Sequence, residues 1–306
     1  MKKTVIEKPK LSSDSIVSVT TMGDVIEVKY LSHRNNAPTI RKLDKTHYEI
    51  ISTGVIFEVE QSENRAENLH SFATSFKNLR ELINANYRHE FPDRLLWLTL
   101  TFKENERDPE VFAHCFDIFW KRMKRYFISN NLEIPKYITC VEPQSRGAWH
   151  GHMLLIFETR APFIDNNEVL EKKWEWGFTK IQRLDNVSNV GAYLTAYLTD
   201  LPLDELEDVS VNTSHTDDVK EIQGKQVSKK FIKGGRLHLY PVGMKLYRSS
   251  SGLKRPVKMQ KTFKQACEMV DCLKGELIYE RHVLIEDAQT EFSSIVSTQQ
   301  FFIHKT

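Results

Sequence analysis

The chain between residues 142 and 157 reads EPQSRGAWHGHMLLIF, a turn-rich loop that runs straight into an apolar strand. Side chains alternate between the two faces of a strand, so His150 and His152 are expected on one face and Gly151 on the other. The Pro and Gly residues of the loop allow Glu142, at the end of the preceding strand, to fold back beside the histidines. Two imidazoles and a carboxylate together indicate a metal site, although an isolated His-x-His pair also arises by chance.

The flanking segments predict the sheet that carries this stretch. A helix should begin with Asp108 as its N-cap and Pro109 at its first position, and a later helix should stop at a left-handed Gly177. The expected elements are, in order, a strand at 94–102, the helix from 108, a strand at 135–141, the histidine strand, a helix at 167–176 and a strand at 178–184. This order predicts an α+β fold with a ferredoxin-like (RRM-like) antiparallel sheet.

The helix that follows Asp108 is amphipathic. Its apolar face is formed by Phe112, Cys115, Phe116, Phe119, Met123 and Tyr126. Its other side carries Lys121, Arg122, Lys124 and Arg125. These bases form either a solvated face, with charges favourable near the helix C-terminus, or a face that contacts phosphates.

A helix expected from Ser188 or Asn189 places two tyrosines on one side. Tyr193 and Tyr197 are four residues apart, so both hydroxyls lie on the same face of the helix. Taken alone, this pattern indicates amphipathic packing, in which tyrosines serve as large apolar residues.

Charge separates sharply in the C-terminal third of the chain. Residues 200–221 hold eight acids and one Lys, whereas residues 223–266 hold twelve Lys and Arg and no acid. A basic stretch interleaved with aromatic residues favours contact with unpaired nucleic acid over a merely solvated surface. The candidate contacts are Lys229, Lys230, Lys233, Arg236, Lys245, Arg248, Lys254 and Arg255.

The patterns together predict five regions. Residues 1–62 read as a small β-rich unit with turns at Gly23-Asp24 and at 52–54, and a helix from about Ser62 to Tyr87 follows. The expected regions are this unit at 1–62, a connecting helix at 63–90, a core at 91–205, an exposed acidic linker at 206–222 and a basic nucleic-acid-contacting region at 223–306.

Composition excludes few classes of protein. With 306 residues, 40% hydrophobic content and a net charge of +2, the chain fits a globular enzyme or a binding module equally well. No stretch approaches the ~18 apolar residues of a membrane span, and the N-terminus lacks a signal-peptide core, so we expect a cytoplasmic location without membrane association. The four cysteines lack zinc or disulfide spacing and read as incidental thiols.

Three ordered motifs give the chain a family resemblance. His150-Gly151-His152 before an apolar strand, Leu98-Thr99-Leu100-Thr101 as an earlier strand, and the helix segment from Tyr193 to Tyr197 together resemble HUH endonucleases. The closest likeness is to two-tyrosine rolling-circle replication initiators of phages and bacterial plasmids. The segments 239–248 and 251–254 also look like the region after the catalytic core, so the resemblance covers roughly residues 65–260.

The resemblance implies a site and an activity. His150 and His152 would be metal ligands with Glu142 as the third, and Tyr193 and Tyr197 would be nucleophiles, Tyr193 for the first cleavage. The implied reaction is nicking and strand transfer of single-stranded or hairpin origin DNA, with Mn²⁺ or Mg²⁺ as cofactor. No G-x-x-x-x-G-K-[ST] motif occurs, so a host helicase and a single-strand-binding protein are the expected partners.

One position departs from the pattern of many relatives. They carry Lys three residues after a catalytic tyrosine, where this chain has Ala196 and Asp200, so Lys180 or Arg183 is expected to contact phosphate instead. A relaxase or a single-strand transposase with the same chemistry stays open as an alternative. So does a non-catalytic RRM-like module that binds nucleic acid through aromatic residues on its central strands, or a metal-free structural protein.

Overall fold

The structure, a computed structural model, divides into two compact units, residues 1–62 with 255–306 and residues 63–254. It describes residues 2–33, 40–44, 46–58, 69–144, 146–184, 191, 201–202, 215–222, 225–232, 239–241, 244–287 and 292–303. Tyr193, Tyr197, Lys233 and Arg236 lie outside the described residues, as does most of the helix expected around the tyrosines.

The unit of residues 63–254 is built on a five-stranded antiparallel sheet. Its strand order is β10-β7-β9-β8-β14, and every neighbouring pair is antiparallel. The strands are β7 (Leu95–Phe102), β8 (Lys136–Pro143), β9 (Trp149–Ile156), β10 (Gly177–Arg183) and β14 (Tyr247–Ser249). The four strands expected between residues 94 and 184 are confirmed, and mixed helices and antiparallel sheets agree with the α+β class.

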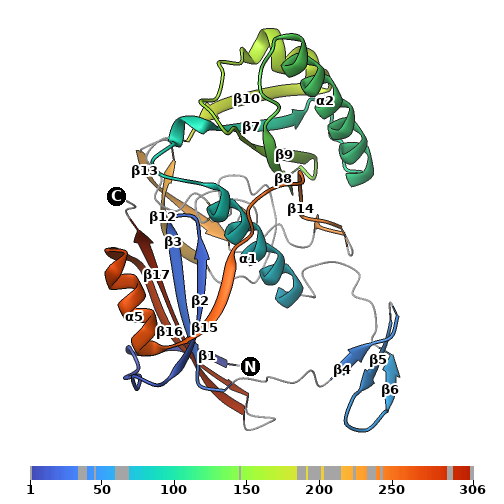
Figure 1. Cartoon of the computed structure of the whole chain (residues 1–306). Helices are drawn as coiled ribbons and strands as arrows, with labels where there is room; N and C mark the ends of the chain where they lie inside the picture. Colours follow the sequence, from blue (N-terminus) through green and yellow to red (C-terminus); the bar gives the residue numbers. More distant parts are fainter. Residues whose placement is uncertain are drawn as a thin grey trace. The chain divides into compact units, whose positions relative to one another are not determined.

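Helix α2 (Pro109–Ser129) covers one face of this sheet (Figure 1). It begins as the sequence predicts, with Pro109 in its first turn and the Asp108 side chain accepting a 2.8 Å hydrogen bond from the Glu110 amide. Its buried residues are Phe112, Cys115, Phe116, Phe119, Met123 and Phe127. The expected Tyr126 is only half-buried, because the four-residue step from Phe119 through Met123 continues to Phe127.

The second helical segment is shorter and ends differently from the prediction. A π-turn, η3 (Asn166–Glu171), leads into α3 (Lys172–Trp174), and Glu175 adopts the left-handed conformation expected of Gly177. Arg122 fixes this end, because its Nη2 donates to Glu175 Oε1 at 2.8 Å. Gly177 instead begins β10, where an added Cβ would lie 2.2 Å from the carbonyl oxygen of Thr101.

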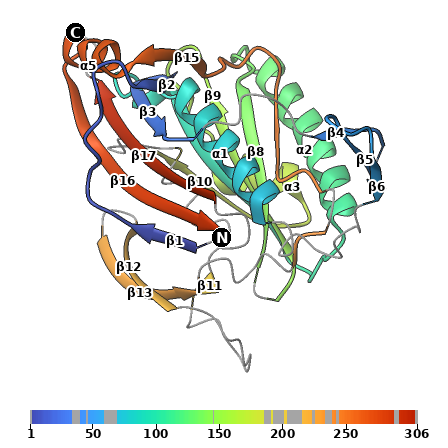
Figure 2. The same ribbon diagram turned by 90° about the horizontal axis from the view of Figure 1, so that it is seen from below.

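Helix α1 (Leu69–Asn86) packs on the opposite face of the same sheet. Figure 2 shows β8 and β9 between α1 and α2. The buried α1 residues Leu79, Leu82 and Ile83 contact a cluster from the sheet that comprises Leu95, Trp97, Ile138, Cys140 and Leu154. A single 3₁₀ turn, η2 (Pro92–Arg94), precedes β7. The helix expected from Ser62 is thus confirmed over the residues that the structure describes.

A separate three-stranded sheet has the order β11-β13-β12. Its strands are β11 (Leu201–Pro202), β12 (His215–Ile222) and β13 (Lys225–Ile232). The register places Asp217 opposite Lys230 and Asp218 opposite Lys229. Residues 215–222 were expected in an acidic linker, but opposite charges across a ladder favour strand pairing, and here they form a hairpin with the basic segment.

The unit of residues 1–62 and 255–306 holds a six-stranded antiparallel sheet of order β1-β16-β17-β3-β2-β15. The strands are β1 (Lys2–Val5), β2 (Ile16–Met22), β3 (Val25–Leu31), β15 (Val257–Thr262), β16 (Gly275–Asp287) and β17 (Phe292–Ile303). Helix α5 (Phe263–Cys272) packs its Ala266 and Val270 against Val17 and Val19. A small sheet joins β4 (Ile40–Lys42), β5 (His47–Ile50) and β6 (Ile56–Glu58).

This arrangement divides the C-terminal part of the chain differently from the sequence-based regions. Residues 223–306 were expected to form one basic region, but β15, β16 and β17 pair with N-terminal strands. Alternating apolar residues in β2 and β3 need partners on both edges, and the C-terminal strands supply them. Among the described residues, no helix is long and apolar enough to cross a membrane.

The packing of α2 predicts which of its residues stabilise the larger unit. Phe119 is 0% exposed, whereas Ile128 on the same helix is 63% exposed. Replacing Phe119 with Ala should lower the free energy of unfolding by about 3–5 kcal/mol, because it leaves a cavity between helix and sheet. Ile128→Ala should change it by less than about 0.5 kcal/mol. Urea unfolding followed by tryptophan fluorescence measures both, and equal effects would contradict this packing.

Candidate metal centre

The β8–β9 hairpin sets the positions of the three candidate ligands. Its register pairs Glu142 with His150, so the two side chains emerge on the same face of the sheet. The connecting turn is closed by two 2.8 Å backbone hydrogen bonds, from Gln144 to Ala148 and from Gly147 to Gln144. Gly147 takes a φ of 88°, a conformation that glycine adopts at little cost. The loop therefore returns the chain in the way the sequence predicts.

Glu142, His150 and His152 converge at the end of the sheet. Glu142 Oε1 lies 3.1 Å from His152 Nε2 and 3.7 Å from His150 Nδ1. One ligand atom from each residue lies within 4.8 Å of the others, a spacing that could hold a metal ion. The side chains of Glu142, His150 and His152 are 8%, 17% and 14% exposed. The group is thus largely buried yet accessible to a ligand.

Two threonines on β7 orient the histidine rings. Thr101 Oγ1 lies 2.9 Å from His150 Nε2, and Thr99 Oγ1 lies 3.4 Å from His152 Nδ1. Each ring therefore turns one nitrogen toward Glu142 and the other toward a hydroxyl, as outer partners of metal-binding histidines do. Trp97 stacks on His152 with ring centroids 5.2 Å apart and an interplanar angle of 12°. The sequence analysis gave these three residues no role, although period-two alternation along 97–101 was an available signal.

The glycine between the two histidines is required by packing on the other face. A Cβ added at Gly151 would lie 2.3 Å from Cζ of Phe112, a buried residue of α2. Any side chain there would push β9 away from α2 or force the Phe112 ring out of place. The His-Gly-His spacing thus serves both faces, because the histidines occupy the open face and the missing side chain lets α2 approach.

Cys140 lies directly across the ladder from His152 but differs in character from the three candidate ligands. Burial, together with the nearby charge of Glu142, raises the pKa of the Cys140 thiol far above its ordinary value. The thiol therefore stays neutral at physiological pH, and the available ligand set is two imidazoles and a carboxylate. Such a mixed N/O set, without thiolate, suits Mn²⁺ or Mg²⁺ better than a closed structural zinc site.

The described basic residues differ in how free they are to contact DNA. Lys180 is exposed on β10, whereas Arg183 is half-buried and donates hydrogen bonds to the carbonyl oxygens of Asp93 and Ala161, both at 3.1 Å. Lys245, Arg248, Lys254 and Arg255 are exposed, and Arg255 belongs to the other unit. Lys229 and Lys230 lie on β13. Arg183 therefore has a structural role that competes with phosphate contact.

An aromatic and a basic residue share the sheet face of the candidate ligands. The register aligns Phe178, Thr101, His150 and Glu142 in one row across four strands, and the next row begins with Lys180. Phe178 is 59% exposed, although it belongs to a strand of the core sheet. An exposed ring and an ammonium group beside the ligand cluster give this face the pattern of a single-strand binding surface. The sequence analysis did not assign Phe178.

Gly191 is the described residue nearest in sequence to the tyrosines. Its amide donates a 2.8 Å hydrogen bond to Asn84 Oδ1 on α1, and a Cβ added there would lie 2.5 Å from the carbonyl oxygen of Arg80. Helix α1 packs on the sheet face that carries the histidines, because its cluster includes Trp97. Gly191 is therefore held close to α1, on the same side of the sheet as Glu142, His150 and His152.

The close approach at Gly151 leads to a stability prediction. Gly151→Ala should lower the free energy of unfolding by about 1–3 kcal/mol, because the new methyl group overlaps the Phe112 ring. Shortening the opposing ring in the double variant Gly151→Ala with Phe112→Leu should return part of that loss, so the two effects should be less than additive. Urea unfolding of the two single variants and the double variant measures this coupling. Strict additivity would show that Phe112 does not limit residue 151.

Comparison with known families identifies the segment that carries this site. Residues 95–201 match a family model of replication-associated proteins, the ORF2 family. Comparisons with curated proteins and with solved structures gave no match. The matched segment starts at the first residue of β7 and includes Glu142, both histidines and both tyrosines. By this match, residues 95–201 belong to the ORF2 family of replication-associated proteins, which supports a role in the initiation of rolling-circle replication.

Proposed function

We propose that this protein is an HUH-type endonuclease that nicks single-stranded origin DNA and transfers the strand through a 5′-phosphotyrosine. By this reaction it would initiate rolling-circle replication of a plasmid or phage-like element. The observation that carries the proposal is the convergence of Glu142, His150 and His152 within the segment that matches replication-associated proteins. A family role in replication and a cluster able to hold a divalent cation together favour phosphodiester chemistry.

The topology of the core supports the HUH assignment. Along the chain the elements run β7, α2, β8, β9, η3 with α3, and β10, and the sheet order is β10-β7-β9-β8. This is the βαββαβ arrangement of a ferredoxin-like fold, extended by β14 at one edge. Trp174 of α3 packs with Phe112 and Phe119 of α2, so both helical segments lie on one face of the sheet. The candidate ligands occupy the other face.

The three ligand side chains fit a metal ion by their chemistry. They offer two neutral nitrogens and one carboxylate oxygen, and Thr99 and Thr101 hold the rings in place. A divalent cation there would offset the charge that develops on the scissile phosphate. Glu142 reduces the charge of the group, and the apolar contacts of Trp97 and Cys140 limit the entry of water from below.

The tyrosines supply the nucleophile in this proposal. The Tyr193 hydroxyl loses its proton and attacks the scissile phosphorus, so a bond forms between the phenol oxygen and the 5′ phosphate. The bond to the 3′ oxygen breaks, and that oxygen leaves as a free 3′-hydroxyl that can prime synthesis. Because the phosphotyrosine keeps the energy of the bond, a later 3′-hydroxyl can reverse the step and join the strand. Tyr197, one turn further on, would allow a second cleavage while the first end is held.

A non-catalytic RRM-like module fits the central strands less well. Such a module stacks bases on aromatic residues of those strands. The aromatic residues of β7 and β9 are Trp97, Phe102 and Trp149, and all three are buried. Trp97 is occupied by His152, so the exposed face is built around the candidate ligands rather than a stacking platform. A relaxase or single-strand transposase would share the proposed chemistry and differ in the DNA it recognises.

Metal binding can be tested without DNA. Titration calorimetry with Mn²⁺ should give one binding event in the wild-type protein, and His152→Ala should weaken it by more than tenfold, since even outer partners of metal ligands contribute about 10–100-fold. His114→Ala is the matched control, because His114 is exposed on α2 and lies outside the cluster. If His152→Ala and His114→Ala bind Mn²⁺ equally well, the proposed centre is wrong.

The nucleophile assignment has a direct chemical test. Incubation with origin single-stranded DNA and Mn²⁺ should give a protein–DNA adduct that survives denaturing electrophoresis, and Tyr193→Phe combined with Tyr197→Phe should abolish it. The hydroxyl is the only group removed, so binding of the DNA should persist in the double variant. An adduct that still forms in the double variant would disprove the assignment.

A further inference from the structure

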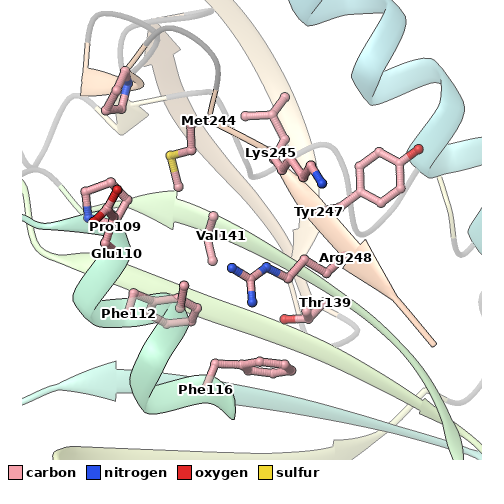
Figure 3. A pocket seen from close by; sticks show the side chains of 13 residues that line it. Pro109, Glu110, Phe112, Phe116, Thr139, Val141, Met244, Lys245, Tyr247 and Arg248 are labelled. Atoms are coloured by element: carbon pink, nitrogen blue, oxygen red, sulfur yellow. The ribbon is translucent and has the colours of Figure 1, made fainter.

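A pocket of about 440 Å³ lies on the sheet face opposite the candidate metal centre (Figure 3). It is formed by the first turns of α2, the edge of β8 and the segment that leads into β14. Thr139 and Val141 line it, and they alternate along β8 with Cys140 and Glu142, which face the other way. Its volume falls within the ~300–1,000 Å³ range of pockets that hold small ligands.

The pocket has an apolar wall on the α2 side. Phe112 and Phe116 stack with ring centroids 6.4 Å apart and an interplanar angle of 19°. Val141 and Met244 add aliphatic surface, and Ala113 leaves space because its side chain is small. A planar ring is the shape that such a wall accommodates best.

Charged groups stand at two sides of this wall. Arg248 extends from β14 toward α2, where Nη1 lies 3.4 Å from Asp117 Oδ1, and Figure 3 shows its guanidinium pointing into the pocket. The side chains of this ion pair are 43% and 61% exposed, so the pair is weak and the guanidinium can exchange it for a ligand. Glu110 lies beside Pro109, on the side away from the β14 backbone, and Lys245 also lines the pocket.

We propose that this pocket binds one unpaired base of single-stranded DNA and favours guanine. The inference rests on the proposed function, because it requires a single-stranded DNA ligand. Arginine donors match the O6 and N7 acceptors of guanine, and a carboxylate accepts from its N1–H and N2–H groups. Adenine offers a donor at N6 where the guanidinium needs an acceptor, and pyrimidines lack N7. Lys245 is placed to pair with a flanking phosphate.

The pocket and the histidine strand share one side chain. Phe112 forms part of the pocket wall and also fills the space above Gly151, between the two histidines. A base held against Phe112 is therefore anchored one residue away from the strand that carries the candidate ligands. This arrangement gives sequence recognition a fixed position relative to the site of cleavage.

The test is equilibrium binding of the full chain to labelled twelve-nucleotide oligothymidines, measured by fluorescence anisotropy in EDTA so that no cleavage occurs. Each oligonucleotide carries one central dG, dA or dC, or remains all-thymidine. The dG oligonucleotide should bind about tenfold or more tightly than the others, since a bidentate base contact discriminates by roughly that factor or more. Arg248→Gln, Glu110→Gln and the pocket-filling Ala113→Leu should each abolish the preference.

Arg125→Gln is the matched control, because it removes one exposed charge of α2 outside the pocket. It should weaken binding of all four oligonucleotides slightly and keep the dG preference. A wild-type protein that binds and nicks DNA without base preference would overturn the pocket proposal and leave the proposed function standing. The same holds if Ala113→Leu, with an unchanged melting temperature, keeps the preference. A protein that binds none of the oligonucleotides would overturn both.

Discussion

The register of the β8–β9 hairpin is the constraint on which the site depends. It sets Glu142 directly opposite His150, and a slip of one residue would turn the carboxylate toward α2. The turn is held by Gly147, by the hydrogen bond from Gln144 to Ala148, and by Arg146, whose Nη2 donates to the carbonyl oxygen of Phe102 at 2.8 Å. The start of β9 is fixed as well, because the Trp149 indole donates to the carbonyl oxygen of Arg107 at 2.8 Å.

The two faces of the sheet divide stability and chemistry between them. One face buries the aromatic side of α2, and the close approach at Gly151 makes this packing possible. On the other face, α1 covers the apolar end, while the polar end presents the three candidate ligands. Rigid apolar packing behind β9 means that the histidines need little reorganisation to meet a ligand, which is the condition for electrostatic stabilisation of a charged transition state.

The sequence was informative where local pattern and burial agree. Alternation along 150–152 placed both histidines on one face, and Asp108 with Pro109 located the start of α2 correctly. It failed where partners are distant in the chain. Gly177 was taken for a helix cap, but it allows β10 to approach Thr101, and β15 could not be assigned to β2 because nothing local indicates that pairing. Thr99 and Thr101 acquire their role only through their register with β9.

The central claim is that Glu142, His150 and His152 bind a metal ion. Pulsed electron paramagnetic resonance of the protein with one equivalent of Mn²⁺ tests it most directly, because nitrogen couplings report imidazoles bound to the ion. The account predicts couplings from two histidine nitrogens, of which His150→Ala and His152→Ala each remove one. A spectrum of Mn²⁺ without nitrogen couplings, or one that neither substitution changes, would contradict it.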